Sequence, residues 1–262
     1  MAGDPDVLVL GGGFAGVVAA RELCAAGHSV RLLEARERLG GRTWFRKDAL
    51  AGHDLELGGA WIVPEHRHVW AEVERYGLEA PFWGLPSSYG WLTDGVLRHG
   101  ALPVPSEELP DLERVLFAMR DAAARLDLSR PLAEQDVADL DATPSDRWLD
   151  ALDLPPNTRE LALAWFSGTA SALPSECSIL EVLRWLAAAN NSLWRWLAAS
   201  VLGHVVADGT AALVAAIAAD AAADVRLASP VLSVAHDADG VTVRSGGSSP
   251  AEHRAGAAVV AL

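Results

Sequence analysis

A glycine-rich turn near the start of the chain restricts the possible folds most strongly. The apolar run Val7–Leu10 is followed by Gly11, Gly13 and Gly16 in Gly-x-Gly-x-x-Gly spacing, and then by an apolar stretch typical of a helix. A buried strand that turns tightly into a helix needs glycine at these positions, and the helix N-terminus then suits phosphate groups. The pattern predicts a strand, turn and helix that bind the ADP half of a dinucleotide, with Phe14 and Ala15 at the helix start.

An acidic residue completes the pattern at the end of the next predicted strand. Val30–Leu33 is a short apolar run, and Glu34 follows it directly. An acid at this position accepts hydrogen bonds from ribose hydroxyls in dinucleotide sites. Glycine turns alone are common, so the prediction depends on the strand, the helix and Glu34 occurring in register.

The segment after Glu34 is locally basic in an acidic chain. Residues 34–47 contain five basic and two acidic side chains, whereas the whole chain has a net charge of −14. A guanidinium pairs bidentately with phosphate oxygens, and glycine lets backbone approach a cofactor. This segment favours a flavin dinucleotide over a nicotinamide one, although a solvated basic loop would have the same composition. The candidate residues here are Ala35, Arg36, Gly40, Gly41 and Arg42.

Together these segments resemble the flavin-dependent amine oxidase family, which includes monoamine, polyamine and L-amino-acid oxidases. The resemblance rests on the glycine turn, on the run from Glu34 to Arg42, and on a third segment from Asp54 to Ile62. It implies FAD as the cofactor. It also implies that Gly58, Gly59, Ala60 and Trp61 run beside the isoalloxazine ring and that the backbone of Val231 contacts the adenine.

The resemblance implies oxidation of an amine C–N bond to an imine, with oxygen as acceptor and release of hydrogen peroxide. Family members place a lysine near the flavin, but the only lysine here, Lys47, lies in the basic segment, so no catalytic side chain is assigned. Two alternatives remain open. One is another FAD oxidoreductase of this fold, such as a desaturase or a protoporphyrinogen oxidase-like enzyme, and the other is a catalytically incomplete nucleotide-binding fragment.

The expected fold is α/β, with a Rossmann-like FAD-binding domain of the GR2 type that combines a parallel sheet with a β-meander. Residues 1–80 and 203–262 are predicted to form this domain, and residues 81–202 a mainly helical, partial substrate domain inserted into it. The second segment is expected to contain a helix over 210–223, a strand from 224 to 235 that turns at Asp239-Gly240 into a second strand at 241–244, and a third short strand. Residues 91–97 are expected to form a hairpin, and Thr143-Pro144 and Ser175-Glu176 to begin helices.

The last residues form an apolar run, Ala257–Leu262, of the kind found in a strand buried on both faces of a parallel sheet. The resemblance covers little more than half of a family member. The chain is therefore expected to be an N-terminal portion, with the remainder supplied by the same gene product or by a second chain; a homo-oligomer is the alternative.

Composition limits the other partners. A net charge of −14 argues against nucleic acid or an anionic membrane as a primary partner. The first residues lack the pattern of a secretory signal, and the two cysteines, Cys24 and Cys177, suit a reducing compartment, so a cytoplasmic location is expected. His66 and His68 lack companion ligands in sequence, so no metal site is expected.

Overall fold

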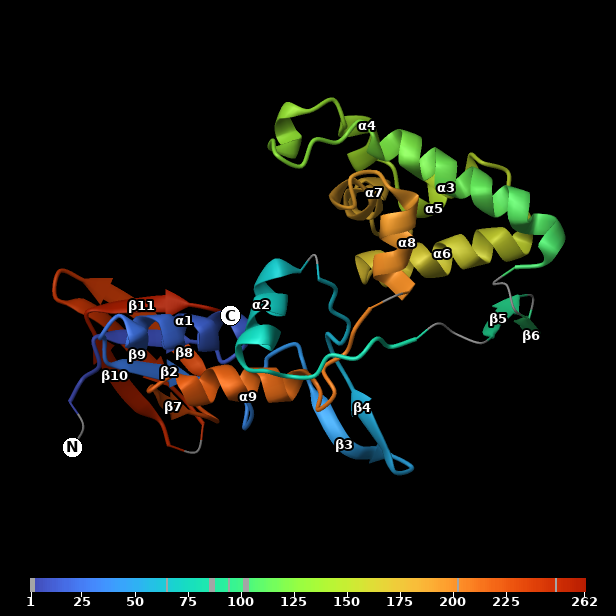
Figure 1. The fold of residues 1–262 in the computed structure, drawn as a ribbon. Helices are drawn as coiled ribbons and strands as arrows, with labels where there is room; N and C mark the ends of the chain where they lie inside the picture. Colours follow the sequence, from blue (N-terminus) through green and yellow to red (C-terminus); the bar gives the residue numbers. More distant parts are fainter. Residues whose placement is uncertain are drawn as a thin grey trace. The chain divides into compact units, whose positions relative to one another are not determined.

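The computed structural model describes residues 3–64, 66–84, 88–93, 95–100, 104–201, 203–247 and 249–262. The chain divides into two compact units (Figure 1). One comprises Met1–Trp83 with Gly203–Leu262, and is called the α/β unit below; the other, Gly84–Leu202, is called the helical unit. The predicted mixed α/β architecture with a parallel sheet is confirmed.

The α/β unit contains a parallel four-stranded sheet with the strand order β11-β1-β2-β7. The strands are β1 (Val7–Leu10), β2 (Val30–Leu33), β7 (Asp224–Arg226) and β11 (Ala257–Val260). All four residues of β1 are buried, because apolar side chains leave both faces of this strand. Val9 and Leu32 pack with helices α1 (Phe14–Ala25), α2 (Arg67–Arg75) and α9 (Thr210–Asp220).

A three-stranded antiparallel meander packs against the side chains of the parallel sheet that point the other way. Its strands are β8 (Val231–Asp237), β9 (Gly240–Ser245) and β10 (Ala251–Ala255), in the order β10-β9-β8. Leu8, Leu10 and Leu33 form one buried cluster with Val243 and Ala255 of the meander. The alternation of side chains along β1 therefore divides the core of the unit into two layers. A further hairpin joins β3 (Phe45–Leu50) to β4 (His53–Glu56).

Polar contacts connect α1, α2 and α9 in this unit. Arg21 of α1 donates hydrogen bonds of 2.8 Å to Glu72 and to Tyr76, and the Tyr76 hydroxyl donates to Asp220 over 3.0 Å. The Glu72 carboxylate raises the pKa of Arg21, whose side chain is only 6% exposed. The first helix after the glycine turn is therefore fixed at its far end to α2 and α9.

The helical unit consists of a hairpin and a helical core. The hairpin pairs β5 (Tyr89–Thr93) with β6 (Val96–Gly100), which confirms the prediction for residues 91–97. The core includes Met119, Phe166 and Leu183. The helices are α3 (Leu109–Ala123), α4 (Ala138–Asp141), α5 (Ser145–Asp150), α6 (Pro156–Ala170), α7 (Ile179–Ala188) and α8 (Leu193–Val201), with short 3-10 turns at Ser106–Glu108 and Leu132–Glu134. No helix in the described ranges is long and apolar enough to cross a bilayer.

Several boundaries differ from the sequence predictions. The strand expected over 224–235 is two strands, because Ala228 adopts a positive φ of 50° and Ser229 hydrogen bonds to Glu34. The helix expected over 210–223 ends at Asp220, because Ala221 is extended. The start predicted at Thr143-Pro144 is confirmed, since α5 begins at Ser145, but the start predicted at Ser175-Glu176 lies three residues early, because α7 begins at Ile179.

The last strand is also less buried than its composition indicated. In the described sheet β11 occupies an edge, where it pairs with β1. Ala257 and Val260 are exposed, and Val260 retains 64% of its accessible surface. The prediction of a strand buried on both faces is therefore wrong, because an apolar run alone does not distinguish an edge position from a central one.

A buried histidine in the meander is expected to make stability depend on pH. Nε2 of His253 lies 3.0 Å from the Ser245 hydroxyl, and burial lowers the pKa of His253, with a further contribution from Arg31 and Arg226. The unfolded chain then binds a proton more readily than the folded chain below about pH 6.5. Stability should therefore be full above that pH and decrease as the pH falls through the unfolded pKa towards the lower folded one.

The comparison is between the unmodified chain and His253→Gln, each unfolded in urea at about pH 7.5 and about pH 5.5. We expect the loss of unfolding free energy on acidification to be smaller in the variant, because it lacks the group that titrates. An equal loss in both proteins would show that His253 does not contribute to the pH dependence.

Candidate dinucleotide site

The three glycines of the turn have different surroundings. Gly11 has a φ of +109°, and a Cβ there would lie 2.4 Å from the Ala261 carbonyl oxygen. A Cβ on Gly16 would lie 1.9 Å from the Gly11 carbonyl oxygen, so α1 can approach β1 only with glycine at this position. At Gly13, by contrast, the nearest atom to an added Cβ is Gly41 Cα at 3.9 Å. Gly11 and Gly16 shape the turn, whereas Gly13 leaves space before the helix.

Helix α1 begins at Phe14 without a side-chain cap. Gly13 is the N-cap residue, and no side-chain hydrogen bond caps the helix. Ala15 is exposed in the first turn, whereas Phe14 is half-buried. The N–H groups of a first helical turn need partners from outside the helix, and the dipole makes an anion favourable there. The open space at Gly13 and the helix start therefore fit a phosphate group.

Glu34 lies at the end of β2 and contacts the turn directly. It is only 4% exposed, and its carboxylate accepts 2.7 Å hydrogen bonds from the N–H groups of Gly12 and Arg36. A carboxylate has about four acceptor positions, so these bonds leave capacity for ribose hydroxyls. Glu34 thus also supports the turn, a role that the sequence interpretation missed.

The basic segment after Glu34 lies against the glycine turn. The N–H of Gly40 donates to the Gly12 carbonyl over 2.8 Å, and a Cβ on Gly41 would lie 3.3 Å from Gly13 Cα. Arg36 and Arg42 are exposed, and the structure describes no ion pair or hydrogen bond of either guanidinium. Both groups are therefore available to an anionic ligand at this edge of the sheet.

The third segment continues from Arg42. A Cβ on Gly58 would lie 2.1 Å from the Arg42 carbonyl oxygen, and the N–H of Gly59 donates to the same oxygen over 3.3 Å. Trp61 is 62% exposed, although its Cβ and ring lie against Gly203. Ala60 between them is half-buried. The glycine turn, the loop at Gly40–Arg42 and the segment from Gly58 thus form one continuous series of backbone contacts.

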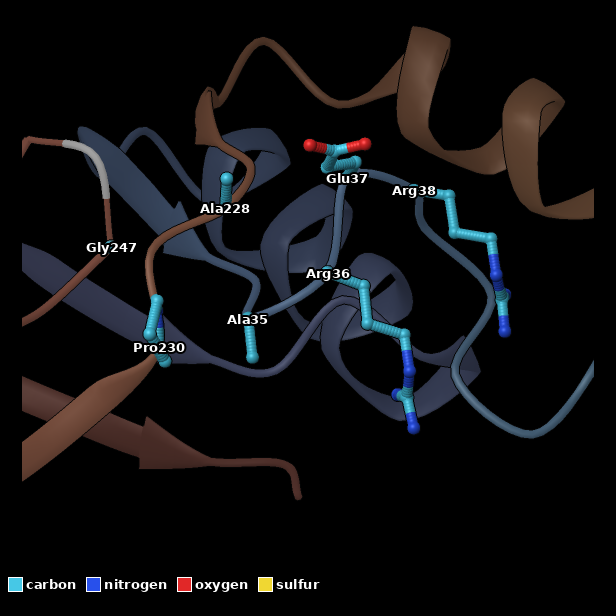
Figure 2. Close-up of a pocket in the computed structure, with 7 residues that line it drawn as sticks. All are labelled: Ala35, Arg36, Glu37, Arg38, Ala228, Pro230 and Gly247. Atoms are coloured by element: carbon cyan, nitrogen blue, oxygen red, sulfur yellow. The ribbon is translucent and has the colours of Figure 1, made fainter.

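An open depression of about 550 Å³ lies beside the end of β2 (Figure 2). The segment before β8 forms one side of it, because Ala228 donates to the Arg36 carbonyl and Ser229 to the Glu34 carbonyl, both over 2.9 Å. In Figure 2 Arg36 and Glu37 extend in opposite directions. The lining residues are Ala35, Arg36, Glu37, Arg38, Ala228, Pro230 and Gly247.

Val231, whose backbone was predicted to contact the adenine, does not line this depression. Its side chain packs with the cluster around Leu8 and Val243, whereas the preceding residue, Pro230, lines the depression. The contact of the Val231 backbone with the adenine stays a prediction, and the sequence interpretation did not include Ala228, Pro230 and Gly247, which line the depression. The turn-forming pair Ser229-Pro230 was the available signal, because proline interrupts a strand.

The family model described as flavin containing amine oxidoreductase matches residues 14–262. The chain belongs to this family. The resemblance inferred from the sequence is therefore confirmed, and membership of this family implies a flavin cofactor.

Relatives of this chain agree with the family assignment. It is 34% identical to (S)-6-hydroxynicotine oxidase of Paenarthrobacter nicotinovorans over 245 residues, which covers 92% of this chain and 57% of the relative. It is 32% identical to pseudooxynicotine dehydrogenase of a Pseudomonas species over 247 residues, covering 92% and 48%. The chain thus spans about half the length of the curated relatives it matches.

Solved structures also match almost the whole chain while extending well beyond it. A putrescine oxidase bound to putrescine superposes with a TM-score of 0.81 at 25% identity, covering 98% of this chain and 58% of the other. Cyclohexylamine oxidase from Brevibacterium oxydans IH-35A gives 0.80 at 26% identity, covering 99% and 58%. These neighbours support the fold over almost the whole chain.

Proposed function

We propose that this chain is the FAD-binding portion of an enzyme that oxidises the C–N bond of a small amine to an imine, with oxygen as acceptor and hydrogen peroxide as product. The observation that carries the proposal is the continuous series of contacts from Gly13 through Gly41 and Arg42 to Gly58 and Gly59. The backbone of these residues forms one surface at the ends of β1 and β2, which an extended cofactor can approach closely.

Each part of that surface has a chemical role in the proposal. Glu34 accepts hydrogen bonds from the ribose, and the depression beside Ala35 and Pro230 receives the adenine. The start of α1 and the free guanidinium groups of Arg36 and Arg42 bind the diphosphate. This set of donors and acceptors fits FAD, because its anionic diphosphate would lie between neutral N–H groups and two cations.

The remaining segment would position the flavin ring. Gly58 and Gly59 follow the Arg42 backbone closely, and the backbone from there to Trp61 would lie beside the ring. When bound, the flavin supplies the redox chemistry by accepting a hydride equivalent from the carbon attached to the amine nitrogen. We assign no catalytic acid or base to this chain.

The names of the relatives support the substrate class. Putrescine oxidase, (S)-6-hydroxynicotine oxidase and cyclohexylamine oxidase are named for amines without an α-carboxylate. We therefore propose an amine of that class as substrate.

We also propose that further polypeptide, from the same gene product or a second chain, completes the active enzyme, because the chain spans about half the length of its relatives. The free thiols of Cys24 and Cys177 support a cytoplasmic location.

The test is an amine panel applied, after incubation with FAD, to the complete enzyme, which is this chain together with the further polypeptide proposed above. The panel contains primary amines, diamines, cyclic amines and L-amino acids. Hydrogen peroxide release is measured in air. Reduction of a dye acceptor is measured in the absence of oxygen, because some relatives are named dehydrogenases. Peroxide release with an amine supports the proposal. Dye reduction alone would overturn oxygen as acceptor, and bound FAD that no amine reduces would favour the nucleotide-binding fragment.

A further inference from the structure

Arg38 differs from the other arginines of the basic segment because its guanidinium is occupied by backbone. Nη1 donates to the carbonyl oxygens of Leu39 and Thr43 over 3.1 and 2.9 Å, and Nη2 donates to that of Gly41 over 3.0 Å. The guanidinium carbon also lies 5.0 Å from the centre of the Trp44 ring. One side chain thus joins three carbonyls from a five-residue stretch and stacks on the residue that follows.

The joined stretch contains the glycines that contact the dinucleotide turn. Gly40 and Gly41 have φ values of +105° and +57°, and Gly40 donates to Gly12. The Thr43 hydroxyl and its N–H both donate to the Gly40 carbonyl over 3.0 Å. Adjacent glycines lose much conformational freedom when they are fixed, so a contact that orders them before a ligand arrives lowers the cost of binding.

We infer that Arg38 is a positioning residue that holds the Gly40–Gly41 loop against the glycine turn, in the conformation that receives the diphosphate of a flavin dinucleotide. The inference rests on the proposed function for the identity of the ligand. Arg38 does not itself bind phosphate, because its donors point to Leu39, Gly41 and Thr43. The exposed Arg36 and Arg42 supply the positive charge instead.

Lysine cannot reproduce this contact. The planar guanidinium donates in fixed directions from two terminal nitrogens and stacks on an aromatic ring, whereas an ammonium group is a compact point charge. Arg38→Lys therefore keeps the charge of the loop and removes the bridge. Arg46 provides a matched control, because its guanidinium carbon lies 5.5 Å from the same Trp44 ring while the structure describes no hydrogen bond from it to backbone.

The experiment compares the unmodified chain, Arg38→Lys and Arg46→Lys by calorimetric titration with ADP and with adenosine, which lacks the diphosphate. We expect ADP to bind about tenfold more weakly to Arg38→Lys, and adenosine to change by less than about twofold. Arg46→Lys should stay within about twofold for both ligands. Amide hydrogen exchange in the free proteins gives a ligand-independent measurement, in which Gly40 and Thr43 should exchange faster only in Arg38→Lys.

The outcomes separate this inference from the proposed function. Unchanged ADP affinity in Arg38→Lys, or equal losses for ADP and adenosine, would overturn the positioning role. Unchanged exchange at Gly40 and Thr43 would also overturn it. If the unmodified chain binds neither ADP nor FAD, the proposed function fails together with the diphosphate assignment, while faster exchange in Arg38→Lys would still show that Arg38 orders the loop.

Discussion

A Gly13→Ala variant is expected to fold like the unmodified chain and to bind FAD between about tenfold and about 100-fold more weakly. Gly13 has φ and ψ of −76° and −177°, which alanine adopts readily, and the nearest atom to the added Cβ is 3.9 Å away. The methyl group therefore costs the free protein little. It would occupy the space before α1 that the proposal assigns to the diphosphate.

The measurement pairs thermal unfolding with FAD and ADP titrations. Gly168→Ala is a suitable control, because a Cβ at Gly168 on α6 also meets nothing within 4 Å but lies in the helical unit. The control should bind FAD and ADP as the unmodified chain does. Unchanged affinity in Gly13→Ala would show that the diphosphate does not approach this glycine, and a large loss of stability would contradict the account of its open surroundings.

Gly16→Ala, in contrast to Gly13→Ala, should lower the stability of the folded chain. An added Cβ would lie 1.9 Å from the Gly11 carbonyl oxygen and 3.0 Å from its carbon, so α1 would have to move away from β1. Both elements are part of the buried core, and overpacking of such a site costs up to about 3 kcal/mol, occasionally more. We expect the free energy of unfolding to fall by about 3 kcal/mol.

Urea unfolding of Gly16→Ala and Gly13→Ala under the same conditions tests this difference. The two variants add the same methyl group three residues apart, so their comparison removes effects of composition. A loss below about 1 kcal/mol in Gly16→Ala would mean that the turn tolerates a wider separation of helix and strand than the structure indicates.

The sequence predicted the elements whose cause is local. Gly16 is required by a steric contact within one turn and Gly11 by its positive φ, so their spacing alone indicated the strand and helix. The hairpin at Asp239-Gly240 is confirmed for the same reason, because the turn chemistry lies in two adjacent residues. The division of residues 224–235 was not predicted, because it depends on hydrogen bonds of Ala228 and Ser229 to the distant residues Arg36 and Glu34.

In the candidate site, too, the sequence did not predict what depends on tertiary contacts. Arg36, Arg38 and Arg42 are identical in type and close in sequence, and only the folded loop distinguishes the arginine that bonds backbone carbonyls from the two that remain free. Glu34 was predicted as a ligand for ribose, but its bond to the N–H of Gly12 depends on the packing of the turn. Residue type therefore indicated the chemistry of the site, whereas the division of roles required the tertiary structure.

The central claim is that the ends of β1 and β2 bind FAD through its ADP half. It is tested most directly by adding FAD to the purified chain, removing the free cofactor, and recording the visible absorption spectrum with and without an excess of ADP. The account predicts flavin absorption that remains with the protein, that becomes weaker when ADP competes, and that leaves with the released cofactor on denaturation. A folded chain that retains no flavin and gives no heat of binding with ADP would contradict it.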